Sequence, residues 1–342
     1  MKTNNISPQL IRDVRIDSVK YCLIVLVIVG HVFGHTPFIT PAECVVRDWI
    51  YMFHMPLFIF ISGYFSRKKD AKHFISGCWK IIEPFIVYQL LIKGFEVVRT
   101  GVISLKEFLT PWWVLWYLLS LLYWRVLLQI IPNKTLNNTK FIITSTFIIS
   151  LLAGYFPCDR FLSIQRTLAF LPFFFMGYCM RGKNLFLPSK YKIWSTIFLF
   201  LTLIFPIFFR KYCGDLNFAD PYGNPLMVFS RLFVLTLSIP MSIAFINLVP
   251  NTPWIAKQGK FTMQYYIYHA IIVYVLCIIV SKFILPTSFL AATLYTLIIV
   301  IGIGIASKLT IFTKFTNPSL FFKKRNNNYF KDESNNIKLT IG

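Results

Sequence analysis

The chain has 342 residues, of which 56% are hydrophobic and only 14% are charged. So few charges over this length, together with a mean hydropathy of +0.63, argue against a water-soluble globular protein. The net charge of +22 does not indicate nucleic-acid binding either, because the lysines and arginines follow a membrane-sidedness pattern rather than forming one basic patch.

Apolar segments that are long enough to span a bilayer recur along the chain. We count ten of them: 18–36, 48–65, 77–98, 113–131, 140–156, 161–180, 191–209, 226–249, 261–281 and 286–312. With the N-terminus inside, 25 of the 35 lysines and arginines lie at or near the inner ends of these segments. The positive-inside rule therefore predicts an all-α, polytopic membrane protein with about ten transmembrane helices and both termini in the cytoplasm.

The predicted organisation is a single transmembrane domain with a polar tail. Residues 1–17 are polar and no small-residue cleavage site follows the first apolar segment, so we expect no cleavable signal peptide. The transmembrane domain is predicted over 1–320, and the Asn- and Lys-rich stretch 321–342 is predicted to be a disordered cytoplasmic tail. Tryptophans near segment ends, Trp113 and Trp124 among them, suit an interfacial aromatic belt.

The first apolar segment carries ionisable side chains along one stripe of the predicted helix. Lys20 and His31 are about 20° apart around the axis and about 16 Å apart along it, and His35 lies one turn further on the same face. Ionisable groups inside a span usually face a polar interior, so they indicate a functional site. His31 is our predicted general base, because histidine accepts protons near neutral pH. Asp17 is expected to anchor Lys20 or to cap the helix.

Two further histidines fall in apolar segments. His54 stands two residues before Pro56 and marks either part of a site or the kink that the proline imposes. The segment boundaries place His269 nearer the inner side than His31, about 10 Å away along the membrane normal. His73, by contrast, follows a basic run on the inner side and is expected to be a solvated loop residue.

Other charged residues lie within the spans. Arg166 and Arg231 each stand near the outer end of a segment. They either snorkel to the interface or line a cavity near the histidine stripe and bind a carbonyl, a phosphate or a sugar hydroxyl. Glu83 precedes a proline in the third segment and is a buried-carboxylate candidate that pairs with Lys80 or Lys20.

Recognisable motifs of soluble enzymes are missing from the sequence. It contains no HEXXH, and no intramembrane carboxylate stands at ligand spacing from the histidine pair, so we predict no metal site. It also contains no P-loop, no GxGxxG and no GxSxG, and no serine or cysteine stands in a recognised nucleophile motif.

Several short motifs follow one another along the chain. They are RIDSVK (15–20), His31, FHMPLF (53–58), SGY (62–64), WYL (116–118), RTLAFLPFFFMGY (166–178) and GKFTMQYYIYH (259–269). In this order they resemble the acyltransferase-3 family of integral membrane acyltransferases, and in particular its fucose-O-acetylase-like, polysaccharide-modifying branch. The resemblance covers nearly the whole chain. Lys20 stands where the family commonly has an arginine, and it offers a point charge without the bidentate fork of a guanidinium.

The resemblance implies O-acyl transfer, usually of an acetyl group from cytoplasmic acetyl-CoA to a sugar hydroxyl of a surface polysaccharide or of its lipid-linked precursor. His31 and His269 would be catalytic. The donor phosphates would be bound at the cytoplasmic mouth by Arg15, Lys20, Arg67, Lys68 and Lys69. The acceptor side would comprise Arg166, His35, His54, Glu83 and Trp116. The implied location is the bacterial cytoplasmic (inner) membrane.

The expected partners are a carbohydrate acceptor, the lipid bilayer and polysaccharide-synthesis machinery, without nucleic acid and without a metal. Two other functions stay open at this stage. The histidines would form a proton relay in a glycan or lipid transporter, although the lack of an internal repeat weakens that interpretation. A non-catalytic scaffold of a polysaccharide synthase is the other alternative, and within the enzyme class the donor could carry a succinyl or longer acyl group.

Overall fold

The computed structural model describes residues 14–35, 40–102, 104–157, 160–209, 218, 220–283 and 288–316. Every regular element within these ranges is a helix, which confirms the all-α prediction. The α-helices are α1 (Val14–His35), α2 (Pro41–Tyr51), α3 (His54–Tyr64), α4 (Ala71–Thr100), α5 (Leu105–Leu109), α6 (Trp116–Ile130), α7 (Asn133–Asn137), α8 (Thr139–Leu152), α9 (Ile164–Ala169), α10 (Leu171–Cys179), α11 (Lys192–Leu201), α12 (Ile204–Phe209), α13 (Met227–Leu248), α14 (Pro253–Gly259), α15 (Thr262–Phe283), α16 (Phe289–Ala306) and α17 (Thr310–Thr316). The tail predicted over 321–342 lies outside the described residues.

Among the described residues, seven helices or consecutive helix runs have the length and composition to cross a membrane. They are Val14–His35, Pro41–Tyr64, Trp113–Ile130, Ser189–Phe208, Met227–Leu248, Thr262–Phe283 and Phe289–Ala306. The chain is a polytopic membrane protein. The three other predicted segments are also helical but differ in kind. α4 carries more charges than a typical span, Thr139–Tyr155 is a shorter apolar helix, and 161–180 is broken into η3 (Phe161–Ser163), α9 and α10.

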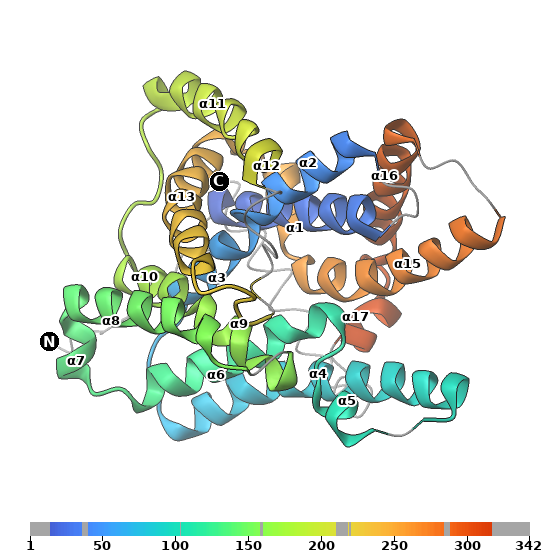
Figure 1. The fold of residues 1–342 in the computed structure, drawn as a ribbon, viewed down its shortest axis with the longest axis horizontal. Helices are drawn as coiled ribbons and strands as arrows, with labels where there is room; N and C mark the ends of the chain where they lie inside the picture. Colours follow the sequence, from blue (N-terminus) through green and yellow to red (C-terminus); the bar gives the residue numbers. More distant parts are fainter. Residues whose placement is uncertain are drawn as a thin grey trace, which may run out of the picture.

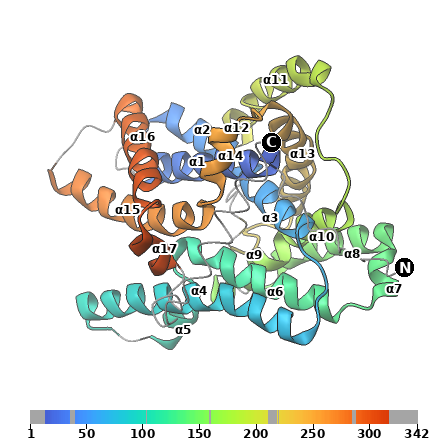
Figure 2. The same cartoon turned by 180° about the vertical axis from the view of Figure 1, so that it is seen from behind.

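Helix α1 occupies the centre of the fold. It packs against α2, α3, α14, α15 and α16, and Figure 2 shows the short helix α14 lying against it. Gly259 at the end of α14 permits this approach, because a Cβ added there would lie 2.1 Å from the backbone oxygen of Asp17. α1 therefore contributes most of its surface to contacts inside the protein, and the polar residues on it are held in defined positions.

Helices α3 and α10 cross with their backbones almost in contact. A Cβ added at Gly63 would lie 1.9 Å from the backbone oxygen of Phe174, and one added at Gly177 would lie 1.9 Å from the oxygen of Phe60. Small residues at a helix crossing, here one glycine on each helix, let membrane helices approach this closely. The crossing links the α3 side of the molecule to α8, on which α10 also packs (Figure 1).

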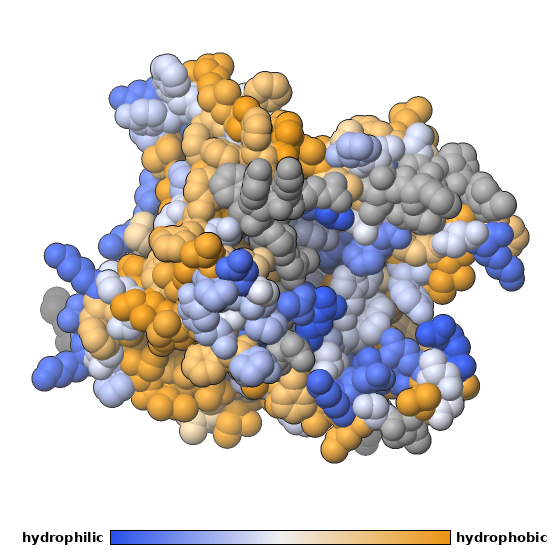
Figure 3. All heavy atoms as spheres, in the orientation of Figure 1, coloured by the Kyte–Doolittle hydropathy of each residue, from blue (hydrophilic) through white to orange (hydrophobic). Residues whose placement is uncertain are grey.

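Large apolar side chains are exposed on the outer helices. Examples on five of these helices are Leu91, Ile148, Phe200, Phe229 and Ile298. In Figure 3 apolar atoms cover much of the left and lower margins, whereas polar atoms gather near the middle of the view. Exposed apolar surface on this scale is what a bilayer covers, because lipid tails are as apolar as these side chains.

Candidate active site

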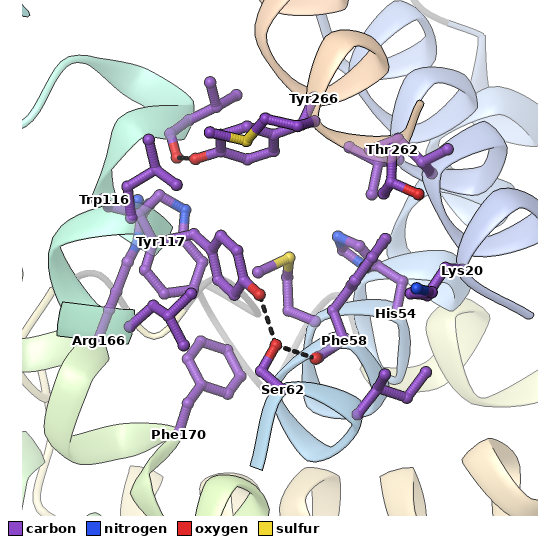
Figure 4. A pocket seen from close by; sticks show the side chains of 18 of the residues that line it. Lys20, His54, Phe58, Ser62, Trp116, Tyr117, Arg166, Phe170, Thr262 and Tyr266 are labelled. Carbon is purple, nitrogen blue, oxygen red and sulfur yellow. Dashed lines mark hydrogen bonds between the residues drawn. The ribbon is translucent and has the colours of Figure 1, made fainter. Parts of the chain in front are cut away.

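One cavity of about 1170 Å³ runs among helices α1, α2, α3, α4, α6, α9 and α15. Figure 4 shows its centre, where residues of α3 and α6 face residues of α15 across the space. The lysines and arginines that line it are Lys20, Arg47, Lys69, Lys80, Arg125, Arg160 and Arg166. Asp48 is the one carboxylate among the described lining residues, and it pairs with Arg47 at 2.7 Å. The cavity is therefore strongly cationic and suits an anionic ligand.

His31 lines the cavity and is held by His269 behind it. His31 Nδ1 lies 2.9 Å from His269 Nε2, and His269 Nδ1 lies 2.7 Å from the carbonyl oxygen of Tyr265. A carbonyl oxygen only accepts, so we assign the proton of His269 to Nδ1 and the acceptor role to its Nε2. His31 Nδ1 must then be the donor. This leaves the lone pair of His31 on Nε2, for which no partner occurs among the described residues.

The expectation that these histidines lie about 10 Å apart along the normal is wrong. It assumed that hydropathy boundaries mark where each helix starts relative to its neighbours. The structure instead packs α14 against the start of α1, with Gly259 against Asp17. α15 therefore begins deeper along α1 than its boundary indicates, and His269, which is fully buried, reaches His31.

Trp113 covers the two histidines of α1. Its ring centroid lies 4.7 Å from that of His31 and 4.4 Å from that of His35. His35 Nδ1 donates to the carbonyl oxygen of His31 at 3.0 Å, within the same helix. Trp113 has a φ of 30°, which a residue with a Cβ rarely adopts and which is often found at functional sites. Sequence reasoning placed Trp113 in an interfacial belt and so missed this role.

A break in the sixth segment brings Arg166 into the cavity. Leu162 and Ser163 have φ values of 48° and 59°, and α9 starts immediately after them. Thr167 holds α9 against α6, since its hydroxyl lies 2.7 Å from that of Ser120. The guanidinium of Arg166 lies 5.0 Å from the ring centroid of Trp116, a cation–π distance. Of the two alternatives for Arg166, the structure favours the cavity over snorkelling.

Two other predictions need correction in this region. Trp124, predicted at an interface, is fully buried and its Nε1 donates to the carbonyl oxygen of Thr167 at 2.9 Å. Arg231 neither snorkels nor lines the cavity. It is buried, its guanidinium lies 4.4 Å from the ring centroid of Tyr222, and its Nη1 donates to the carbonyl oxygen of Ser150. Arg231 therefore anchors the adjacent loop to α8.

The second segment is broken where His54 was expected to mark a kink. α2 ends at Tyr51 and α3 begins at His54, whose Nδ1 donates to the carbonyl oxygen of Ile50 at 2.8 Å. His54 also lines the cavity. It therefore lies both at the break in the segment and on the candidate site. Deeper along α3, Ser62 donates to its own helix and accepts from the Tyr117 hydroxyl at 2.6 Å. Figure 4 shows the Tyr117 ring reaching into the space from α6.

Most of the basic residues predicted for the donor side do not line the cavity. Lys20 and Lys69 do, and Lys20 Nζ pairs with Asp17 at 2.6 Å, as expected. The guanidinium of Arg15 lies 3.6 Å over the ring of Phe186, and Lys68 Nζ donates to a backbone carbonyl of Ile131 at 2.5 Å. Two cations outside the predicted set, Lys80 of α4 and Arg125 of α6, also line the cavity.

The remaining sequence candidates are placed as follows. Arg67 is exposed three residues after the end of α3, and Glu83 is partly buried on α4; neither is among the lining residues. His73 lies in the first turn of α4 rather than in a loop, because Asp70 caps that helix, and it lines the cavity. Within the described part of the chain, no three His, Cys, Asp or Glu side chains group together as a metal site would require.

Most of the chain matches a known protein family. A family model described as an acyltransferase domain matches residues 13–308. The chain is also similar to nodulation protein NolL of Sinorhizobium fredii (strain NBRC 101917 / NGR234), with 29% identity over 126 residues. That match covers 32% of this chain and 34% of NolL, so it spans about a third of the curated relative. No solved structure matches the chain.

Proposed function

Because this chain belongs to the acyltransferase-3 family, whose domain model spans residues 13–308, we propose that it moves an acetyl group from acetyl-CoA to a sugar hydroxyl. The chain is a multi-pass membrane acyltransferase. In our proposal the acceptor is a surface polysaccharide or its lipid-linked precursor, residues 1–320 form the catalytic domain, and the protein works in a bacterial inner membrane beside polysaccharide-synthesis machinery.

The observation that carries this proposal is the hydrogen bond between His31 and His269. It directs the proton of His31 to Nδ1 and leaves the Nε2 of this cavity-lining histidine free to act as a base. Nε2 would take the proton of the acceptor hydroxyl while the hydroxyl oxygen attacks the thioester carbonyl. The carbon–sulfur bond then breaks, and the proton on Nε2 passes to the leaving thiolate. The products are the acetyl ester and free CoA.

The surroundings of His31 supply the other functions that acyl transfer needs. Arg166 is a cation held over Trp116 in the same cavity, and we propose that it stabilises the negative charge that develops on the carbonyl oxygen. Trp113, Trp116 and Tyr51 line the cavity. Flat aromatic walls with a few placed polar groups are typical of small-ligand sites, and we propose that they receive the acceptor sugar.

The donor and the reaction are tested with membranes from cells that carry the chain and from cells with an empty vector. Both are supplied with acetyl-CoA or succinyl-CoA labelled in the acyl group, and the glycans are analysed by mass spectrometry. We expect labelled acetyl ester only with the chain present. Labelled succinate in its place would contradict the donor, and proton-driven glycan transport without any acyl incorporation would contradict the reaction.

Substitutions of His269 separate its orienting role from simple packing. His269→Gln keeps a side-chain acceptor for His31 Nδ1–H, whereas His269→Leu removes it and leaves a buried donor unpaired. We expect kcat to fall roughly tenfold or less in the glutamine variant and roughly 100-fold in the leucine variant, at an unchanged KM for acetyl-CoA. Equal kcat values in the two variants would show that the hydrogen bond does not orient His31.

A further inference from the structure

Gln89 lies on α4, outside the cavity lining, and holds the turn that leads into α6. Its side chain is buried. The Nε2 of its amide donates to the carbonyl oxygens of Phe108 and Thr110 at 2.9 Å and 2.8 Å, and its Oε1 accepts from the N–H of Trp112 at 2.8 Å. The two N–H groups and the oxygen of this amide are therefore all used on one short stretch of backbone, residues 108–112.

A regular helix cannot run through this stretch. Pro111 has no N–H, and it disfavours the helical conformation at the residue before it. Thr110 is accordingly extended, with φ −81° and ψ 116°. The carbonyl of Phe108 and the N–H of Trp112 would bond to each other in an α-helix, and here the Gln89 amide bonds to both of them instead. Gln89 thus replaces the missing helical bonds.

Trp113 follows directly after the residue whose N–H is bound by Gln89. Its φ of 30° is strained for a residue with a Cβ and persists only where the surrounding structure fixes it. The next residue is fixed as well, since the Tyr266 hydroxyl on α15 donates to the carbonyl oxygen of Val114. Gln89 on α4 and Tyr266 on α15 therefore hold the backbone on the two sides of Trp113.

The Trp113 ring limits how the His31 ring can turn. Its centroid lies 4.7 Å from that of His31. His31 offers Nε2 as a base only while its Nδ1 stays bonded to His269. A half-turn of the imidazole about its Cβ–Cγ bond would put a ring carbon in the place of Nδ1 and break that hydrogen bond. The indole packed against His31 opposes such a turn.

We propose that Gln89 is a positioning residue for acyl transfer, which fixes residues 108–112 and thereby holds Trp113 against His31. The proposal rests on the function proposed above, because that function makes His31 the base. Misplacing a reacting group by about 1 Å costs roughly 100-fold in rate. Gln89 does not line the cavity, so its loss should lower kcat and leave the KM for acetyl-CoA unchanged.

The first test is a double-mutant cycle on the purified full-length chain. Gln89→Met keeps the length of the side chain and removes its three hydrogen bonds, and we expect kcat to fall roughly tenfold with the KM for acetyl-CoA within about twofold. Trp113→Ala should lower kcat at least as much. Adding Gln89→Met to Trp113→Ala should then change kcat by less than about twofold, because Gln89 acts through Trp113.

The matched control removes a buried amide elsewhere. Asn247 on α13 is buried, and its Nδ2 donates to the Ser195 hydroxyl of α11 at 3.0 Å. Neither residue lines the cavity. Asn247→Leu should therefore lower stability as Gln89→Met does, but leave kcat within about twofold. If Gln89→Met does not fold, Gln89→Asn, whose amide is one methylene shorter, takes its place in the cycle.

A second readout keeps this proposal separate from the proposed reaction. Hydrogen–deuterium exchange of the amides in residues 108–115 is measured in detergent. We expect it to become roughly tenfold faster in Gln89→Met and to stay unchanged in Asn247→Leu. This result supports the positioning role even if the wild type transfers no acetyl group, in which case the proposed function alone fails.

Two results would overturn the proposal while the reaction at His31 stands. If the effects of Gln89→Met and Trp113→Ala on kcat add up in the double variant, Gln89 does not act through Trp113. If hydrogen exchange in residues 108–115 is the same in Gln89→Met as in the wild type, Gln89 does not hold the turn.

Discussion

Acyl transfer should fall at least about 100-fold when His31 is replaced by alanine, because a positioned general base contributes roughly 10²- to 10⁴-fold to such a reaction. His31 lines the cavity, and its Nδ1 is bonded to His269, which leaves its Nε2 without a partner among the described residues. The measurement is mass spectrometry of surface glycans from cells that carry wild type, His31→Ala or an empty vector, with the membrane content of each protein determined by immunoblot.

The matched control is His35→Ala. His35 lies one turn further along α1, lines the same cavity and contacts the same Trp113 ring, but its Nδ1 is bonded to the backbone of its own helix. We expect this variant to lose only a few-fold in activity. A full acetyl-ester signal in His31→Ala at normal membrane content would refute the mechanism, although the family membership would stand.

The sequence pattern was sufficient for features that lie along a single helix. The stripe of Lys20, His31 and His35 follows from helical spacing alone, and the structure places all three on the cavity. The pairing of Asp17 with Lys20 also follows, because side chains three residues apart on a helix are neighbours. Local geometry of this kind is set by the backbone and does not depend on how other helices pack.

Features that depend on contacts between distant segments could not be predicted. Arg125 and Lys80 both line the cavity because α6 packs on α4. In the contiguous basic run 67–69, Lys68 instead donates to the backbone carbonyl of Ile131. The sixth segment reads as one apolar span, yet it breaks at Leu162 and Ser163. Hydropathy records whether a segment prefers lipid, and it carries no information on where buried hydroxyl groups such as Ser120 hold a bend.

The glycine pair at the α3–α10 crossing leads to the largest expected effect on folding. Gly63→Ala and Gly177→Ala each place a methyl group 1.9 Å from a backbone oxygen of the opposite helix, and a backbone, unlike a flexible side chain, cannot turn away. Overpacking of this kind costs about 1–3 kcal/mol or more. We expect each variant to lower the thermal midpoint of the detergent-solubilised protein by several degrees and to reduce its amount in the membrane several-fold.

The comparison that isolates the crossing is Gly94→Ala, since nothing lies within 4 Å of a Cβ added there. Alanine is favoured over glycine inside a helix by roughly 0.5–1 kcal/mol, so this control should be neutral or slightly more stable. If Gly63→Ala were as stable as Gly94→Ala, the two helices would have to lie further apart than the structure shows. His54, which α3 places on the cavity, and Arg166, which enters it from α9 just before α10, would then no longer be held opposite one another. A loss of both folded protein and activity in Gly63→Ala and Gly177→Ala therefore tests the scaffold that brings these two side chains to one site.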